Sequence, residues 1–199
     1  QLNTRGRLSG ADLVATAESL AEFHGSAGKG LTQPDTGLRV DRIAALADQL
    51  AVLLPHLEQR AKAVAQKLSH WLSQQAQVAQ PVHGDFYDKQ AIINNGKVRL
   101  IDLDAACLGN PLLDLGSFIA HLERLQGNHV LSASKLEMQK NTLVTAYEKL
   151  TGSEHTDHHN RYTALSLFGL IHHPFRDWTP DWPGQTEVLL ERVESLLVS

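Results

Sequence analysis

The stretch HGDFYDKQAIINNGKVRLIDLD, residues 83–104, decides how this chain is organised. At its centre, the Asn95-Gly96 step favours positive φ and is a strong signal for the tight turn of a β-hairpin. We therefore expect strands over residues 91–93 and 97–103. A hairpin this small cannot form an independent sheet domain. We expect it to lie on a helical body and to present its loops there.

Three carboxylates and one amide flank this hairpin. Asp85 follows a short extended segment, Gln90 precedes the first strand, and Asp102 and Asp104 close the second. Because side chains alternate along a strand, Asp104 is expected to face the same side as Asp102. Magnesium prefers hard oxygen ligands, and a carboxylate on a rigid turn can accept a proton from a hydroxyl. These residues predict a site that activates a hydroxyl beside a magnesium-bound polyphosphate.

The rest of the chain has the periodicity of amphipathic helices. Ser9 is expected to cap the first of them and Gly25 to end it. Before the hairpin, apolar residues recur at helical spacing over residues 10–24, 41–54 and 56–75; after Pro111 they do so over residues 113–125, 134–150, 162–172 and 186–197. The expected fold class is mainly α with a small β-hairpin insert.

Composition and charge exclude several classes of protein. The chain has 199 residues and a net charge of −4, and its Lys and Arg residues are scattered, which argues against a nucleic-acid interface. No apolar run approaches the ~20 residues that a membrane helix needs, and the N-terminal residues lack the apolar core of a signal peptide. The single cysteine, Cys107, excludes an intrachain disulfide. We expect a cytoplasmic protein.

Three motifs together resemble the aminoglycoside phosphotransferase and choline kinase family, which shares the protein-kinase-like fold. They are H-G-D-F-Y-x-x-Q at residues 83–90, I-D-L-D at 101–104 and G-N-P-L-L-D-L at 109–115. The resemblance implies an ATP-dependent kinase that phosphorylates a hydroxyl of a small molecule, with Mg²⁺ as cofactor.

The resemblance also implies residue roles. Asp85 matches the family's catalytic base, and Asp102 matches the carboxylate that bridges metal to the nucleotide phosphates. Gln90 stands where the family has a metal-binding Asn; it keeps the amide oxygen but adds a methylene, so it should hold the metal less rigidly. Asp104 is expected as a second metal ligand or as a residue that orients the first ligands.

Two further residues are expected to support the site rather than to react. His83 is interpreted as a brace that is hydrogen-bonded to backbone near the metal site. Asp114, at the start of a helix, is interpreted as a cap or as a partner of the catalytic turn.

The resemblance places residues 1–199 in the C-terminal, catalytic lobe of such a kinase. No V-A-x-K run or glycine-rich hairpin precedes the first helix, so the N-terminal nucleotide-binding lobe is expected to be absent from this chain. On this interpretation the chain alone is incomplete and binds nucleotide poorly. Residues 105–110 run directly to Pro111 without an activation segment, which disfavours a protein substrate.

The acceptor is expected to be an aminoglycoside-, choline- or sugar-like hydroxyl compound. Acidic residues outside the motifs favour an amine-bearing one, although helix faces in solvent explain them equally well. These residues are Glu123, Glu137, Glu148, Glu154 and Asp157.

Two other segments have a structural and a functional interpretation. The aromatic, turn-rich residues 172–184 form either a loop packed by Trp178 and Trp182 or a lid over the acceptor cleft. The histidines within residues 155–159 favour a solvated surface over a zinc site, because zinc needs three or four convergent ligands.

Two alternative functions remain open from the sequence. Gln90 and the missing lobe are compatible with a regulatory or binding module that kept the fold and lost activity. A metal-dependent phosphate hydrolase could use Asp85, Asp102 and Asp104 on water.

Overall fold

The computed structural model describes residues 8–33, 36–76, 78–127, 130–152 and 159–198. Helices make up most of this part of the chain, which confirms the expected fold class. The helices are α1 (Gly10–His24), α2 (Thr36–Leu53), α3 (Glu58–Ser73), α4 (Leu112–Gly127), α5 (Ala133–Thr151), α6 (His159–Gly169), α7 (His173–Arg176) and α8 (Trp182–Val198), with short 3₁₀ turns at Pro55–Leu57, Asp88–Gln90 and Leu103–Ala105.

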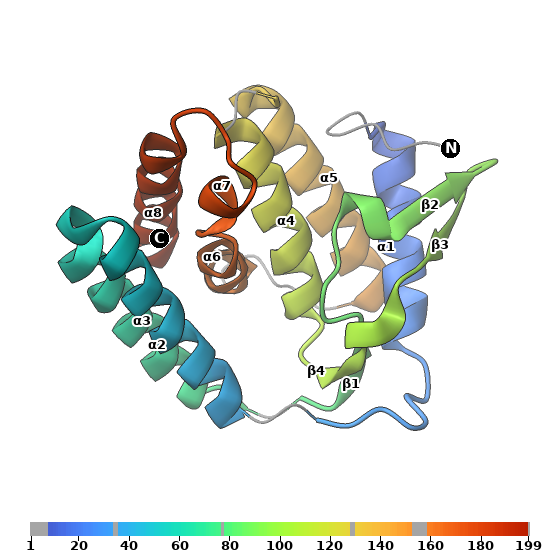
Figure 1. The fold of residues 1–199 in the computed structure, drawn as a ribbon. Coiled ribbons are helices and arrows are strands. Elements are labelled where there is room, and N and C mark those ends of the chain that lie inside the picture. Colours follow the sequence, from blue (N-terminus) through green and yellow to red (C-terminus); the bar gives the residue numbers. More distant parts are fainter. Residues whose placement is uncertain (1–7, 34–35, 77, 128–129, 153–158, 199) are drawn as a thin grey trace.

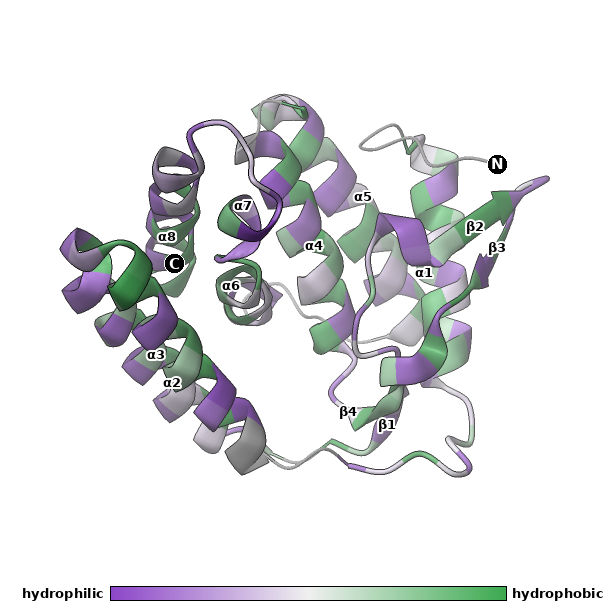
Figure 2. Cartoon of the chain, in the orientation of Figure 1, coloured by the Kyte–Doolittle hydropathy of each residue, from purple (hydrophilic) through white to green (hydrophobic). Residues whose placement is uncertain are grey.

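Figure 1 shows α4 near the middle of the molecule. On one side of it, α1 and α5 pack against each other; on the other, α6 packs along α4 and α8 packs on α6. The α2–α3 pair forms the outer edge beyond α6 and α7. Both α2 and α3 carry polar and apolar residues, as amphipathic helices should (Figure 2). Within the described residues, every helix is too short or too polar to span a membrane.

The contact between α4 and α6 depends on a glycine. A Cβ atom on Gly116 of α4 would lie 2.5 Å from the carbonyl carbon of Tyr162 in α6. Because that neighbour is backbone, it could not move aside without shifting the whole helix. Gly116 therefore lets the two helix backbones approach closely in the core.

The strands form two antiparallel pairs. The hairpin consists of β2 (Ala91–Asn94) and β3 (Lys97–Leu100), and its turn residues Asn95 and Gly96 have φ angles of 50° and 74°. This confirms the hairpin that the Asn-Gly step predicts. Ser19 of α1 donates a hydrogen bond to the carbonyl of Val98 (3.1 Å), which ties β3 to the helical body.

The second pair was not expected from the sequence. It joins β1 (Gln80–Val82) to β4 (Cys107–Gly109), with Pro81 opposite Leu108. Three-residue strands carry too little alternation to be recognised, and the pairing joins segments on either side of the hairpin. It closes residues 83–106 into one loop at its base.

The strand that precedes the two aspartates ends earlier than predicted. β3 stops at Leu100, Asp102 has a left-handed φ of 61°, and residues 103–105 form a 3₁₀ turn. The expectation that Asp104 shares a side with Asp102 on an extended strand is therefore wrong, because the chain leaves the extended conformation between them.

Helix ends agree closely with the capping signals. Ser9 Oγ accepts a hydrogen bond from the Asp12 amide (3.2 Å), and the Asp12 carboxylate accepts one from the Ser9 amide (2.9 Å). This reciprocal capping box confirms the start of α1, and Gly25 follows its last turn. α2 begins at Thr36, several residues earlier than predicted.

Residues 172–184 are not one loop, because α7 and the first turn of α8 lie within them. Trp182 packs on Phe175, with 5.0 Å between ring centroids, but Trp178 is 79% exposed. The packed-loop interpretation is thus wrong for Trp178.

Of the histidines within 155–159, only His159 lies among the described residues, and it is buried. The expectation of a solvated surface is wrong for that side chain.

Candidate active site

The H-G-D turn lies against the 3₁₀ turn that follows Asp102. Gly84 has a φ of 83°, and a Cβ atom there would lie 2.3 Å from the carbonyl oxygen of Ala105. Any other residue would be strained by this φ and would collide with backbone. Gly84 therefore allows the turn that carries Asp85 to pack directly on the turn that follows Asp102.

Asp114 of α4 anchors the H-G-D turn. Its fully buried carboxylate accepts hydrogen bonds from the amides of His83 (2.6 Å) and Gly84 (2.9 Å). The third partner of this carboxylate is the ring of His24, whose Nε2 lies 2.9 Å from it. A buried carboxylate with three donors is well satisfied, and hydrogen bonds to an ionised acceptor are stronger than neutral ones.

The network continues beyond His24. Its Nδ1 lies 2.7 Å from the hydroxyl of Tyr147, which is buried in α5. Burial, and then the charge of Asp114, raise the pKa of Tyr147, so this hydroxyl keeps its proton and can donate it to Nδ1. One chain of side chains thus connects α5, α1 and α4 to the backbone beside Asp85.

His83 connects the same turn to the segment before Asp102. Its ring is fully buried, and Nε2 donates a hydrogen bond to the carbonyl of Ile101 (2.8 Å). This geometry suits the predicted brace, because it fixes the backbone immediately before Asp102. The roles of His83 and Asp114 in a reaction stay predictions.

Gln90 and Asp102 lie side by side. The amide of Ile101 donates to the carbonyl of Gln90 (3.0 Å), which extends the hairpin pairing to the residue before Asp102. The Gln90 side chain is buried and its Nε2 donates to the Asp102 carboxylate (2.9 Å), while Asp102 is exposed. The structure therefore brings together the two main metal ligands that the sequence suggested.

Asp104 does not complete a cluster of carboxylates. Among the residues that the structure describes, no three His, Cys, Asp or Glu side chains are grouped so as to hold a metal ion. A carboxylate with a neighbouring amide nevertheless fits Mg²⁺, which takes only one or two protein ligands and completes its shell with water and phosphate oxygens.

Tyr87 lies between the two halves of the site. Its pKa is raised, first by burial and then by the charges of Asp85, Asp88 and Asp102. Its ring stacks on His121 of α4, with 4.3 Å between centroids and 13° between planes. The Tyr87 side chain thus connects the H-G-D turn to α4 and remains close to the acidic groups.

Asp85 lines a cavity of about 580 Å³. The walls come from the H-G-D turn, α2, α4, the end of α6, and α7. Among the described residues that line it, neither Gln90 nor Asp102 appears. Asp85 therefore faces a cavity on one side of the turn, and the Gln90–Asp102 pair lies outside that cavity.

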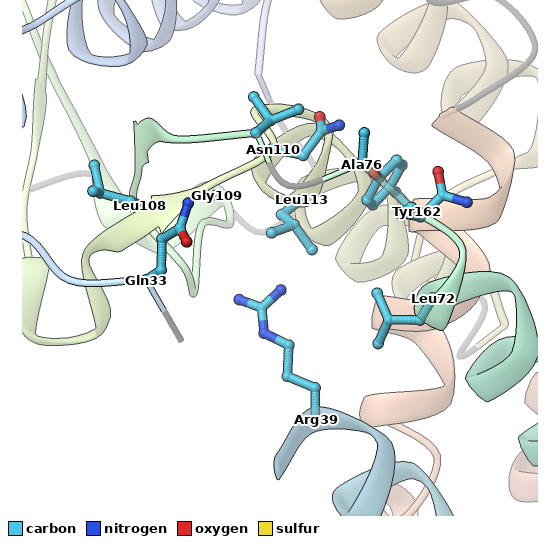
Figure 3. A pocket seen from close by; sticks show the side chains of 11 residues that line it. Gln33, Arg39, Leu72, Ala76, Leu108, Gly109, Asn110, Leu113 and Tyr162 are labelled. Carbon is cyan, nitrogen blue, oxygen red and sulfur yellow. The ribbon is translucent and has the colours of Figure 1, made fainter. Parts of the chain in front are cut away.

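The charged walls of this cavity are basic. Arg39 and Arg42 of α2 and Arg176 of α7 line it, and Asp85 is the one carboxylate among its described lining residues. A smaller cavity of about 70 Å³ shares Arg39 and Leu113 with it. Figure 3 shows Arg39 reaching from α2 into the space beside Leu113.

Two histidines in the cavity wall are held neutral. Burial, and then the charge of Arg124, lower the pKa of His121 to about 3; burial, and then Arg176, lower that of His173 to about 4. The sequence singled out residues 172–184, which include His173 and Arg176, as a candidate lid over the acceptor cleft. It did not select His121, Arg39 or Arg42, because helical periodicity does not show which polar position faces a distant turn.

Among the acidic residues that suggested an amine-bearing acceptor, those that the structure describes do not line this cavity. Glu123 instead accepts two hydrogen bonds from Arg192 of α8 (2.9 and 2.6 Å). Glu137 and Glu148 belong to α5, and Glu154 and Asp157 lie outside the described residues.

Replacing Asp114 with Asn tests the anchor. The amide would present N–H groups to donors, so we expect the free energy of unfolding to fall by about 3 kcal/mol, as for a broken buried ion pair. Urea denaturation followed by circular dichroism measures it. Asp48→Asn, on the exposed side of α2, is the matched control and should change stability little. A loss below about 1 kcal/mol for Asp114→Asn would contradict the anchoring role.

The pKa of His121 predicts how stability depends on pH. A folded-state pKa of about 3, against 6.5 for the free side chain, means that the unfolded chain binds the proton more readily. The stability that neutral His121 contributes to the fold is therefore present in full above pH 6.5 and is lost as the pH falls toward 3. His121→Gln should reduce the loss of unfolding free energy between pH 7 and 5 by about 2 kcal/mol. Denaturation at both pH values measures this, and the exposed His70→Gln should leave the loss unchanged. Equal losses in wild type and His121→Gln would contradict the shift.

The model of one protein family, described as "APH: Phosphotransferase enzyme family", matches residues 3–150, well over half of the chain. No curated protein matches the chain significantly.

Several solved structures share the fold. A choline/ethanolamine kinase family protein from Mesorhizobium loti is 17% identical with a TM-score of 0.65, and the match covers 95% of this chain and 63% of that one. The aminoglycoside phosphotransferase APH(4)-Ia, as a thermostable mutant, is 18% identical (TM-score 0.63; 100% and 69%). A glucosamine kinase is 16% identical (TM-score 0.70; 98% and 56%). At these identities the likeness shows the fold alone, and the chain spans less than two thirds of the first and third of these proteins.

Proposed function

Because the chain belongs to the phosphotransferase enzyme family, we propose that it is the catalytic lobe of a kinase that transfers the γ-phosphoryl group of ATP to a hydroxyl of a small molecule. One observation carries this proposal: the exposed Asp85 opens onto a large cavity, while the Gln90–Asp102 pair, which follows the same anchored turn, lies outside that cavity. Acceptor and polyphosphate would thus meet at one carboxylate from opposite sides.

Asp85 would act as the general base. A hydroxyl in the cavity would give its proton to the Asp85 carboxylate as its oxygen bonds to the γ-phosphorus. The bond from that phosphorus to the β–γ bridging oxygen would break, and ADP would leave. Phosphoryl transfer depends mainly on positioning. The hydrogen bonds that the consecutive amides of His83 and Gly84 donate to Asp114 support a fixed position for this base.

Asp102 and Gln90 would hold Mg²⁺. When bound, the ion would neutralise charge on the phosphate oxygens. Gln90 now donates its amide N–H to Asp102. A half-turn of the amide about its last torsion would point the oxygen toward a shared cation instead. Asp104, displaced by the 3₁₀ turn, would contribute through water or by orienting Asp102.

The solved relatives make ATP and a small hydroxyl compound reasonable substrates. APH(4)-Ia has been solved with ADP and hygromycin B, and the glucosamine kinase with glucosamine, ADP and inorganic phosphate. In our proposal the glycine-rich loop and strand lysine that complete such kinases belong to a separate N-terminal, nucleotide-binding lobe.

Asp85→Asn tests the base. In the full-length natural protein, we expect kcat for ATP-dependent phosphorylation to fall about 10²- to 10⁴-fold, because Asn cannot accept the proton, while KM for ATP changes little. A panel of hydroxyl compounds with ³²P-labelled ATP provides the assay, and Asp48→Asn provides the matched control.

The same assay separates the alternatives. Unchanged turnover in Asp85→Asn would remove Asp85 from the chemistry. Absence of both turnover and magnesium-dependent nucleotide binding in the wild type would favour a non-catalytic module. Release of phosphate from simple esters by this chain, abolished in Asp85→Asn, would favour a metal-dependent hydrolase.

Two substitutions of Gln90 test the metal site. Gln90→Asn keeps the amide oxygen on a shorter side chain and should retain metal binding, whereas Gln90→Leu removes the oxygen. We expect the apparent affinity for Mg²⁺ to fall about tenfold in the Leu variant, as when a ligand or its support is lost. Titration of Mn²⁺ followed by paramagnetic relaxation of water measures this without turnover. Equal affinity in all three proteins would exclude Gln90 as a ligand.

A further inference from the structure

The basic cavity beside Asp85 has more positive charge than a neutral acceptor needs. Arg39, Arg42 and Arg176 face Asp85 across about 580 Å³. With His121 and His173 neutral and Arg176 paired with Asp177, the guanidinium groups of Arg39 and Arg42 still outweigh the single carboxylate of Asp85.

Two of these arginines are not neutralised by neighbours. Arg176 contacts Asp177, with 3.1 Å between Nε and Oδ1. Arg39 and Arg42 form no ion pair with any residue in the described part of the chain. Both extend from α2 at the wall of the cavity. Arg39 also contacts the Cys107 thiol, whose pKa is raised by burial, so this neutral partner does not cancel its charge.

The imidazoles in the wall respond to other arginines, Arg124 and Arg176. After burial, the largest causes that lower the pKa of His121 and His173 are the nearby arginines Arg124 and Arg176. Arginines therefore also lie near the imidazoles on the α4 and α7 side, where Arg124 and Arg176 share Asp177 as a partner. An ammonium group would be repelled there and an anion attracted.

The lining of the cavity includes the proposed base but not the proposed metal ligands. Gln90 and Asp102, which would face the polyphosphate, do not line this cavity, whereas Asp85 does. The excess positive charge therefore lies on the side where the hydroxyl acceptor would enter.

We propose that the acceptor of this site is an anionic hydroxyl compound, which carries a carboxylate or phosphate group bound by Arg39 and Arg42 of α2. That the bound molecule is a phosphoryl acceptor rests on the proposed function. The preference of the cavity for anions does not depend on phosphoryl transfer. The bidentate fork of each guanidinium suits both kinds of anion.

A set of hexoses that differ in charge tests the proposal. Isothermal titration of this chain without nucleotide gives dissociation constants for glucuronate, glucose 6-phosphate, glucose and glucosamine. We expect at least one of the two anions to bind about tenfold more tightly than glucosamine, equivalent to about 1.4 kcal/mol, with glucose between them. The difference should shrink with added salt. The tighter anion identifies whether carboxylate or phosphate is preferred.

Substitutions assign the preference to α2. Arg42→Gln and Arg39→Gln should each reduce the anion preference severalfold, whereas Arg42→Lys keeps the charge and most of the preference. Arg161→Gln, exposed on α6 and outside the cavity, is the matched control. Thermal unfolding of each variant verifies that it folds. Binding of glucuronate should also move the ring NMR signals of His121 and His173.

Three results would overturn the inference: glucosamine binding as tightly as the anions, no binding of any hexose, or an anion preference that survives loss of both α2 arginines. Arginine variants that weaken only magnesium–nucleotide binding would also overturn it. The proposed function fails separately, through absence of phosphoryl transfer in the full-length protein. If the cavity prefers anions but no phosphoryl transfer occurs, the anion site is supported and the proposed kinase function is not. If neutral acceptors are phosphorylated and Arg42→Gln has no effect, the kinase function is supported and the anion site is not.

Discussion

The carboxylate of Asp114 is the interaction on which the site depends. It lies in the core at the start of α4 and accepts hydrogen bonds from two consecutive amides of the H-G-D turn and from His24. Through His24 it also reaches Tyr147 of α5. A loop would otherwise be free to move, but here it is fixed to three helices by one buried charge. The position of Asp85 is thus determined by the core rather than by the loop itself.

Two surfaces with different chemistry meet at this fixed turn. One has the Gln90–Asp102 pair at the end of the hairpin, and the other has the cavity with arginines from α2 and α7. The first is built from residues close together in sequence. The second is assembled from helices far apart in the chain, so its chemistry can change while the turn and hairpin stay the same.

Local signals in the sequence were sufficient for the hairpin, the helices and the cap at Ser9, because each depends on neighbours within a few residues. They also selected Asp85, Gln90 and Asp102. They failed at the backbone of Asp102. The run of β-forming residues suggested a strand to residue 103, but Asp102 has a left-handed φ and the 3₁₀ turn that follows it packs on Gly84, a residue distant in sequence. The β1–β4 pair and the arginine-lined cavity depend on long-range contacts, which periodicity does not encode. The arginines line the cavity because the fold brings α2 and α4 to the same space.

The absence of a side chain at Gly84 has a mechanical consequence. The backbone there touches the carbonyl of Ala105 so closely that no compressible space separates the two turns. Atoms in such contact transmit displacement instead of absorbing it. A shift of the segment around Asp102 would therefore be carried to the neighbouring turn, and with it to Asp85.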